Sequence, residues 1–203
     1  MERDGFRLYP GALDASAQRA LLGEVLGAAQ IAPFYRPVTP GGKPMSVQMT
    51  NLGPVGWTTD ARGYRYEPQH PATGRPWPPI PQALLGLWDE LTGASAPPDA
   101  CLVNSYGPDA RMGLHQDKDE ADFSLPVLSV SLGDTAVFRL GGARRSDPSR
   151  TMRLASGDVC VLAGPARLYF HGVDRILAGS SRLVPGGGRI NLTLRRARPR
   201  PPG

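Results

Sequence analysis

Glycine and proline divide the second half of the chain into short apolar segments, and this pattern most restricts the possible folds. Turn dipeptides such as Gly107-Pro108 and Gly164-Pro165 separate these segments. Many short strands joined by such turns are typical of a β-sandwich or a barrel. Alternating or continuous apolar residues predict strands over Ala100–Tyr106, Arg111–Asp117, Val127–Leu132, Ala136–Leu140, Asp158–Leu162, Leu168–Phe170 and Arg189–Leu194.

The composition agrees with this interpretation. Glycine and proline make up 47 of the 203 residues, about 23%, which is just below the share typical of disordered chains. Hydrophobic residues make up 40% of the chain, so a packed core is possible. Long helices tolerate neither glycine nor proline, which argues against a helix bundle. A chain of this length fits one domain.

Two helical segments precede the strands. The first begins after Asp14 or Ser16 as its N-cap, and the second follows a proline cluster and ends at Gly93. Both have one apolar face, so we expect them to support a sheet. The apolar positions are Ala17, Leu21, Leu22, Val25, Leu26 and Ala29 in the first, and Leu84, Leu85, Trp88 and Leu91 in the second.

The segment 37–77 between the helices is rich in glycine, proline and aromatic residues. It contains one strand-like stretch, Ser46–Leu52, and short pairings are expected around Tyr64 and Tyr66. Exposed Trp57, Tyr64 and Tyr66 in such a setting suit ligand contact. A loose loop with its aromatic side chains tucked inward is the alternative.

The net charge of +5 is unevenly distributed. From Arg144 to the end, twelve arginines and three aspartates give +9, which leaves −4 for the rest of the chain. A basic C-terminal region indicates an anionic partner, with nucleic acid as the leading candidate. A solvated basic face followed by an Arg/Pro tail is an equally simple interpretation.

Cys101 and Cys160 both lie in apolar runs, which favours reduced thiols packed in a core. The sequence shows no leader peptide and no apolar stretch approaching about 20 residues. We therefore expect a cytoplasmic monomer with no membrane contact.

The chain has three histidines, and two of them belong to a pattern that suggests a metal site. His115 and Asp117 form a His-x-Asp pair, whose side chains share one face if they lie in a strand, and His171 follows 54 residues later. Two imidazoles and one carboxylate form the facial triad of non-heme Fe(II) oxygenases. A surface His-Asp pair with an unrelated core histidine is the alternative that this pattern leaves open.

The last predicted strand alternates strictly between polar and apolar residues. Its polar face consists of Arg189, Asn191, Thr193 and Arg195. On an edge strand this face would simply meet water. Inside a barrel, beside the triad, it would bind a dicarboxylate such as 2-oxoglutarate through bidentate arginine contacts, with Arg195 holding the distal carboxylate.

From about Val38 to Arg195, the sequence resembles the AlkB family of iron- and 2-oxoglutarate-dependent nucleic-acid dealkylases. The resemblance rests on ordered motifs. They are Thr39-Pro40-Gly41-Gly42, Met45-Ser46-Val47, Gly56-Trp57-Thr58-Thr59, Leu114-His115-Gln116-Asp117-Lys118-Asp119-Glu120, Ser129-Val130-Ser131-Leu132-Gly133 and Asn191-Leu192-Thr193 between two arginines.

The resemblance implies a jelly-roll (double-stranded β-helix) core, mainly β with supporting helices, in a single catalytic domain over 1–203. Within it, residues 1–36 form an N-terminal helix and extension, 37–77 a nucleotide-recognition lid, 78–195 the core with one supporting helix, and 196–203 a basic Pro-rich tail.

The resemblance also implies roles for individual residues. Fe(II) would be bound by His115, Asp117 and His171, and Arg195 completes the catalytic set. The residues expected to bind 2-oxoglutarate are Asn104, Tyr106, Arg189, Asn191, Thr193 and Arg195. Trp57 and His115 would sandwich the base, Asp119 would face its exocyclic amine, and Tyr64 and Arg145 would line the substrate groove.

The implied reaction uses dioxygen and 2-oxoglutarate to demethylate 1-methyladenine and 3-methylcytosine in single- or double-stranded DNA, and also RNA. It releases formaldehyde, succinate and carbon dioxide. Three positions depart from the family pattern: Asp60, Ser105 and Ile190. The alternatives are an RNA or protein demethylase of the same class and a non-catalytic metal-binding module of cupin type.

Overall fold

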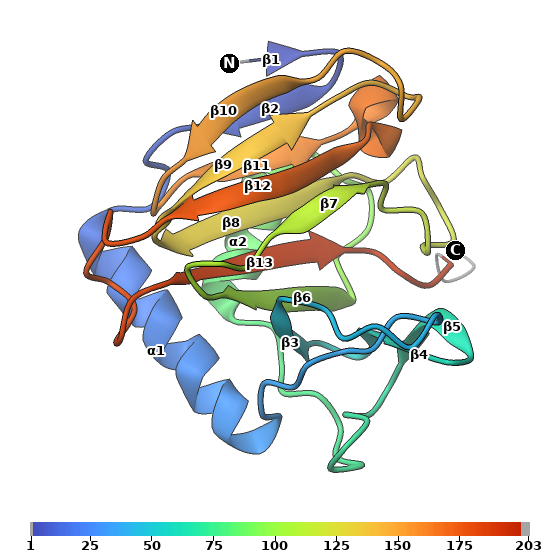
Figure 1. The fold of residues 1–203 in the computed structure, drawn as a ribbon, viewed down its shortest axis with the longest axis vertical. Helices are drawn as coiled ribbons and strands as arrows, with labels where there is room; N and C mark the ends of the chain where they lie inside the picture. Colours follow the sequence, from blue (N-terminus) through green and yellow to red (C-terminus); the bar gives the residue numbers. More distant parts are fainter. Residues whose placement is uncertain (1, 200–203) are drawn as a thin grey trace.

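Two antiparallel β-sheets face each other in the computed structural model of the chain, which describes residues 2–199 (Figure 1). The strands of the larger sheet are, in spatial order, β1 (Glu2–Arg3), β2 (Phe6–Tyr9), β11 (Val159–Leu162), β8 (Val127–Gly133), β13 (Arg189–Arg195), β6 (Ala100–Tyr106) and β3 (Gln48–Leu52). Those of the smaller sheet are β10 (Arg150–Leu154), β9 (Thr135–Leu140), β12 (His171–Leu177) and β7 (Met112–His115). This arrangement confirms the predicted jelly roll.

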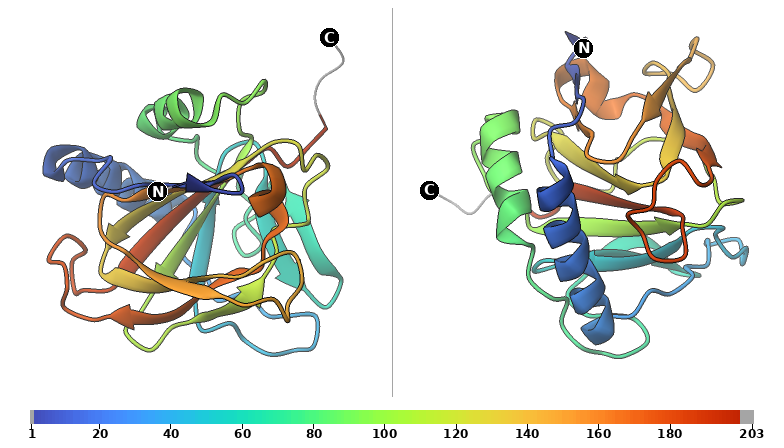
Figure 2. Two further views of the ribbon diagram at one scale, coloured as in Figure 1. Left: turned by 90° about the horizontal axis from the view of Figure 1, so that it is seen from above. Right: turned by 90° about the vertical axis from the view of Figure 1, so that its left-hand side faces the viewer.

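Two helices cover the outer face of the larger sheet, as Figure 2 shows. In α1 (Ala15–Ile31), the Asp14 carboxylate accepts a hydrogen bond from the Ala17 amide at 2.8 Å, so Asp14 is the N-cap. In α2 (Gln82–Thr92), Trp88 packs against the sheet and Gly93 ends the helix with a left-handed φ of 61°. Both helices therefore have the supporting role predicted for them.

The core consists of two layers. One lies between the helices and the larger sheet and includes Cys101, and the other lies between the two sheets and includes Cys160. Both thiols are free and buried, and burial raises the pKa of each to about 12. The structure thus confirms the prediction of reduced core cysteines.

Three features of the strand pattern differ from the sequence prediction. The strand expected at Leu168–Phe170 is wrong, because η1 (Gly164–Leu168) is a 3₁₀-helix and the strand begins at His171. Pro165 lacks an amide donor, which suits the first turn of a helix. The strand expected over Arg111–Asp117 ends at His115. The short strands β1, β2 and β10 were not predicted, because none has a recognisable apolar pattern.

The segment 37–77 is less separate from the core than expected. Its first strand, β3, pairs with β6 at the edge of the larger sheet, and Met49 and Leu52 are buried there. The rest forms a hairpin of β4 (Gly56–Asp60) and β5 (Gly63–Glu67). Tyr64 is exposed as predicted, but Trp57 and Tyr66 are half-buried, and the Tyr66 hydroxyl is turned inward onto Glu120.

The chain after β13 is tied to the start of β6. The carboxylate of Asp99 is 2% exposed and accepts hydrogen bonds from the Ala197 amide at 2.6 Å and from the Arg198 guanidinium at 2.9 Å. The predicted basic tail is therefore anchored in its first residues, while residues 200–203 lie outside the described part. Within residues 2–199, no helix has the length and apolar character that crossing a membrane requires.

Candidate active site

The three predicted metal ligands converge at one end of the barrel. His115 ends β7 and His171 begins β12, and these two residues are paired across neighbouring strands. Asp117 lies in the loop that follows β7, with its carboxylate oxygens 3.7 Å from His115 Nε2 and 3.9 Å from His171 Nε2. One ligand atom from each residue lies within 4.8 Å of the others. The His-x-Asp spacing therefore brings the ligands together even though the strand stops at His115.

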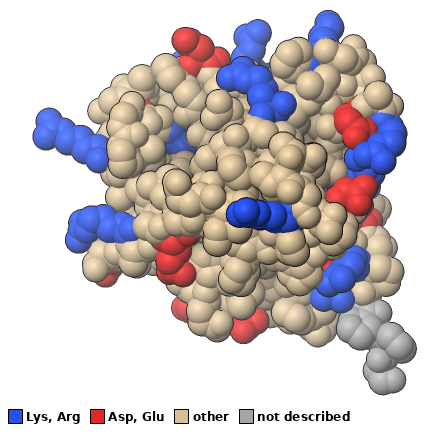
Figure 3. All heavy atoms as spheres, turned by 90° about the horizontal axis from the view of Figure 1, so that it is seen from below, with Lys and Arg blue, Asp and Glu red and all other residues tan. Residues whose placement is uncertain are grey.

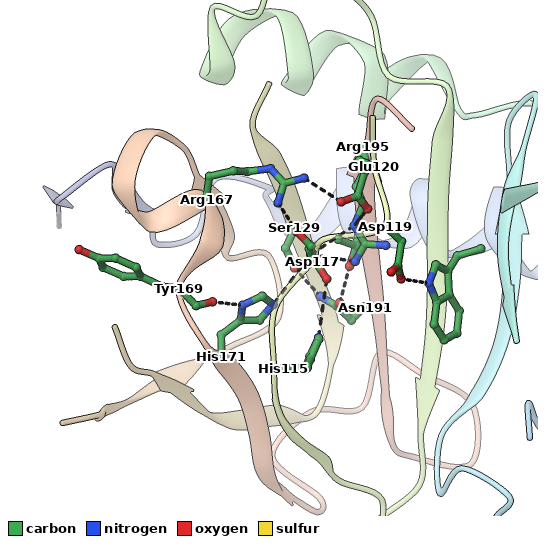
Figure 4. A network of polar contacts seen from close by, with 12 residues as sticks. His115, Asp117, Asp119, Glu120, Ser129, Arg167, Tyr169, His171, Asn191 and Arg195 are labelled. Carbon is green, nitrogen blue, oxygen red and sulfur yellow. Dashed lines mark hydrogen bonds and ion pairs between the residues drawn. The ribbon is translucent and has the colours of Figure 1, made fainter. Parts of the chain in front are cut away.

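Both imidazoles are oriented by main-chain carbonyl groups. The Nδ1 atom of His115 lies 2.9 Å from the Gly113 oxygen. The Nδ1 atom of His171 lies 2.9 Å from the Tyr169 oxygen, as Figure 4 shows. Donation by each Nδ1–H leaves the Nε2 lone pair directed at Asp117, as a metal ligand requires. Burial, together with the neighbouring His115, lowers the pKa of His171 to about 4, so this imidazole is neutral.

The third ligand is held as an anion. Burial by itself would raise the pKa of Asp117, but the charge of Arg195, followed by the two histidines, keeps it well below its usual range. Arg195 Nη2 lies 2.9 Å from the Asp117 carboxylate, and Arg167 Nη1 donates to the Asp117 main-chain oxygen at 2.6 Å. Two neutral nitrogens and one fixed carboxylate fit Fe(II) and leave further coordination positions open.

A cavity of about 70 Å³ extends from the triad between the two sheets. Every residue predicted to bind the cosubstrate lines it, as do the three ligands. The predicted residues are Asn104, Tyr106, Arg189, Asn191, Thr193 and Arg195.

Arg189 provides the test of whether this cavity suits a dicarboxylate. Its side chain is buried, and its Nη1 and Nη2 atoms donate to the Leu154 oxygen at 3.0 Å and to Ser131 Oγ at 2.7 Å. Its Nε has no hydrogen-bond partner within residues 2–199, and it forms no ion pair with a carboxylate of these residues. Burial lowers the pKa of this guanidinium. The buried Oδ1 of Asn104 also lacks a partner. Because a buried, uncompensated guanidinium is costly, these groups fit a carboxylate-bearing ligand such as 2-oxoglutarate.

Asn191 and Thr193 of this cavity are hydrogen-bonded to each other and to β8. Asn191 Nδ2 donates to Ser129 Oγ at 2.8 Å and to the Val130 oxygen at 3.0 Å, and Thr193 Oγ1 donates to Asn191 Oδ1 at 3.0 Å. These two residues therefore form a fixed wall. Arg195 is paired with Asp117 at the metal end of β13, whereas Arg189 lies at the other end of the strand. The expectation that Arg195 holds the distal carboxylate stays a prediction, and the pairing of Arg195 with Asp117 makes Arg189 the better-placed candidate for that contact.

A second, larger cavity of about 470 Å³ opens on the other side of the triad, between the hairpin and the barrel mouth. All four predicted substrate residues line it, namely Trp57, Tyr64, Asp119 and Arg145. His115 and Asp117 belong to both cavities. The metal site thus lies where the two cavities meet.

Contacts among its lining residues give this outer cavity its shape. Trp57 Nε1 donates to Asp119 Oδ2 at 2.8 Å, and the indole stacks on Tyr64 with ring centroids 5.5 Å apart. Arg145 lies over the Phe170 ring at 5.1 Å. The close approach of Asn51 and Trp77 leaves no room for a Cβ at Gly56, where β4 begins.

Several lining residues were not predicted. Met45 lies just before β3 and Met49 within it, whereas Met112 lies in β7, so no local pattern connects them with one cavity. Glu120 and Arg167 form a buried ion pair at 2.9 Å beside the triad. The DKDE run after Asp117 contains Glu120, but a charged run by itself does not distinguish a buried carboxylate from exposed ones.

Comparisons with known proteins agree with this site. The model of the 2OG-Fe(II) oxygenase superfamily matches residues 5–195. The chain is 69% identical to the alpha-ketoglutarate-dependent dioxygenase AlkB homolog of Caulobacter vibrioides, over 96% of this chain and 88% of that protein. It is 46% identical to AlkB of Escherichia coli, over 90% of this chain and 86% of that protein.

A solved structure supports the same assignment. The structure of OsALKBH1 matches with a TM-score of 0.84 and 33% identity, covering 97% of this chain and 98% of that one. The superfamily uses Fe(II), 2-oxoglutarate and dioxygen, for which the His115, Asp117 and His171 cluster provides the metal ligands. The chain is therefore an Fe(II)- and 2-oxoglutarate-dependent dioxygenase that belongs to the AlkB family.

Proposed function

We propose that this enzyme removes methyl groups from N-alkylated bases such as 1-methyladenine and 3-methylcytosine in DNA, and thereby repairs them directly. The observation that carries the proposal is the outer cavity, in which an aromatic wall and a carboxylate face the metal ligand His115. Alkylation at a ring nitrogen makes these bases cationic, so a carboxylate placed beside an aromatic wall favours them over their neutral parents.

The protein's own residues have distinct parts in this reaction. His115, Asp117 and His171 would hold the iron, and Arg189, with Asn104 and Tyr106, would hold the far carboxylate of 2-oxoglutarate. When bound, iron and 2-oxoglutarate supply the oxidising chemistry that hydroxylates the N-methyl carbon with dioxygen. The hydroxymethyl group on the base is unstable and leaves as formaldehyde.

Recognition of the base would depend on the hairpin and the loop after β7. Stacking on Trp57 contributes about 1–3 kcal/mol but discriminates little between bases. Asp119, held by the Trp57 indole, supplies the charge that discriminates. A duplex hides the alkylated ring nitrogen, so the nucleotide must be flipped out or come from a single strand.

The surface charge suits a strand held at a few points. In Figure 3, Lys and Arg side chains on the face seen from below are interspersed with Asp and Glu and form no continuous basic area. Arg167, Arg189 and Arg195 are buried, so the net charge of +5 overstates the basic surface. RNA as a second substrate, a monomeric state and a cytoplasmic location are further parts of the proposal.

Formaldehyde and succinate release from four matched substrates tests the proposal. They are a single-stranded DNA carrying 1-methyladenine, its unmethylated counterpart, the corresponding RNA and a methyl-lysine peptide. We expect equimolar formaldehyde and succinate with methylated DNA, also turnover of the RNA, and none with the peptide. Faster turnover of the peptide than of the DNA would contradict the proposal. Size-exclusion chromatography checks the monomer.

A further inference from the structure

A buried carboxylate three residues after the metal ligand Asp117 joins three separate elements. The Glu120 side chain is 1% exposed. It accepts hydrogen bonds from Arg167 Nη2 of η1 at 2.9 Å and from the Tyr66 hydroxyl of β5 at 2.5 Å, and it lies 3.5 Å from Arg195 Nε of β13. None of the roles derived above uses this residue.

The charges around Glu120 explain why an anion is needed there. Arg195 has two carboxylate partners, Glu120 and Asp117. A metal ion bound to Asp117 shares the charge of that carboxylate, so Glu120 becomes the main counter-charge for the buried guanidinium. Arg167, which holds the main-chain oxygen of Asp117, is neutralised by Glu120 as well.

The hairpin is attached to the same loop. Trp57 and Tyr66 are direct partners across β4 and β5, so their side chains lie on one face of the hairpin. The Trp57 indole donates to Asp119 and the Tyr66 hydroxyl donates to Glu120, which are consecutive residues of the loop that carries Asp117. Asp119 is exposed and faces the outer cavity, whereas Glu120 is buried.

We propose that Glu120 is a positioning residue that couples the seating of the hairpin to the geometry of the metal ligand. Through Tyr66 it holds the wall of the substrate cavity, and through Arg195 and Arg167 it holds Asp117. When a base replaces the Trp57 indole as the hydrogen-bond partner of Asp119, the Tyr66–Glu120 hydrogen bond remains. The hairpin therefore keeps its position during recognition of the base. The part of this inference that concerns the base rests on the function proposed above.

Energetic coupling is reciprocal, which makes the proposal measurable without turnover. Hydrogen exchange of residues 56–67 reports opening of the hairpin, and residues of α1 serve as the internal reference. In the wild type, Mn²⁺ with 2-oxoglutarate under anaerobic conditions should slow this exchange several-fold. In Tyr66→Phe, the exchange without metal should be about tenfold faster, as expected for a hydrogen bond to a charged group, and the added protection by metal should shrink.

The matched control is Tyr9→Phe on β2, which removes a hydroxyl far from the loop and should leave exchange of the hairpin unchanged. Equal protection of the hairpin by metal in the wild type and in Tyr66→Phe would overturn the coupling.

A second variant examines the metal side. Glu120→Gln keeps the shape of the side chain but removes its charge, so Arg195 competes more strongly for Asp117. We expect the Mn²⁺ affinity, measured by calorimetry, to fall about tenfold, within the range for groups that support metal ligands. Wild-type affinity would overturn the assignment.

If Glu120→Gln does not fold, the Tyr66→Phe measurement decides the proposal by itself. Neither measurement uses formaldehyde release, so loss of this inference leaves the proposed demethylation untouched.

Discussion

The two cavities that meet at the metal ligands are built in opposite ways. The inner one, about 70 Å³, lies between two sheets, and its lining combines apolar side chains of both sheets with buried charged and polar groups. The outer one, about 470 Å³, is formed by a hairpin and loops, and its lining combines aromatic residues and methionines with the charged residues of the loop after β7. Rigid strands thus hold the groups that must be placed accurately, while adaptable side chains surround the variable substrate.

This difference predicts how substitutions act. In the inner cavity, removal of one charged partner leaves another charge buried and unpaired, so the effects should be large. In the outer cavity, water can replace a lost contact, so the effects should be graded. Three variants and one labelling experiment test this contrast, in order from the largest expected effect to the smallest.

Asp117→Asn should have the largest effect. It removes the ligand charge and leaves Arg195 without its closest anion. We expect metal affinity to fall by more than about a hundredfold, the upper end of what losses around metal ligands cause, and succinate production to cease. Calorimetry with Mn²⁺ measures the binding. Asp119→Asn, two residues along, should still bind Mn²⁺, and equal losses in both variants would break the contrast.

Arg189→Gln should weaken the cosubstrate selectively. A charge-assisted hydrogen bond is worth about 1.5–3 kcal/mol, so the KM for 2-oxoglutarate should rise about 10- to 100-fold. Mn²⁺ affinity should stay near that of the wild type, because Arg189 lies at the end of β13 away from Asp117. Steady-state kinetics with varied 2-oxoglutarate test this. Arg189→Lys keeps the positive charge but cannot pair with a carboxylate through two parallel hydrogen bonds, so it separates these two contributions. An unchanged KM would assign the distal carboxylate to another group.

Asp119→Asn should have a moderate effect confined to substrate. Loss of one charge near a solvated cationic base costs about 1 kcal/mol, so kcat/KM for methylated DNA should fall about fivefold. The KM for 2-oxoglutarate should not change. Asp109→Asn, in an exposed loop, is the matched control for loss of one negative charge. A more than hundredfold loss of kcat/KM in Asp119→Asn would show that this residue behaves like those of the inner cavity, and would contradict the contrast.

The smallest effect, no modification of either cysteine, is expected when the native protein is treated with a thiol reagent. Cys160 lines the inner cavity, and burial raises the pKa of both cysteines to about 12, so they are protonated and inaccessible at pH 8. Iodoacetamide should leave both unmodified in the native protein and modify both in urea, as measured by mass spectrometry. Rapid native labelling of Cys160 that 2-oxoglutarate blocks would show that the inner cavity opens to solvent.

The inner cavity was more predictable from the sequence than the outer one. The strict alternation of Arg189, Asn191, Thr193 and Arg195 places them on one face of a strand wherever that strand lies. The expected metal triad was found as well. The ends of elements were less predictable. Strand β12 begins only at His171, because Gly164–Leu168 form a 3₁₀-helix that ends shortly before it.

Contacts between distant segments could not be predicted. Tyr66 and Glu120 are 54 residues apart, and nothing in either local sequence indicates that they form a hydrogen bond. The same limit applies to the pairing of the two arginines of β13. Alternation placed both on one face, but only the position of Asp117 after β7 determines which of them is paired with the metal ligand.

The anchoring of the final residues by Asp99 defines where this enzyme can be shortened or fused to another protein. The family match ends at Arg195, yet the donors that satisfy the buried Asp99 carboxylate belong to Ala197 and Arg198. A chain cut after Arg195 would leave that carboxylate unpaired beneath the strand that carries two cosubstrate-cavity arginines. A fusion partner should therefore be joined beyond Arg198. This preserves the hydrogen bonds of Asp99, just before β6, with Ala197 and Arg198, which follow β13.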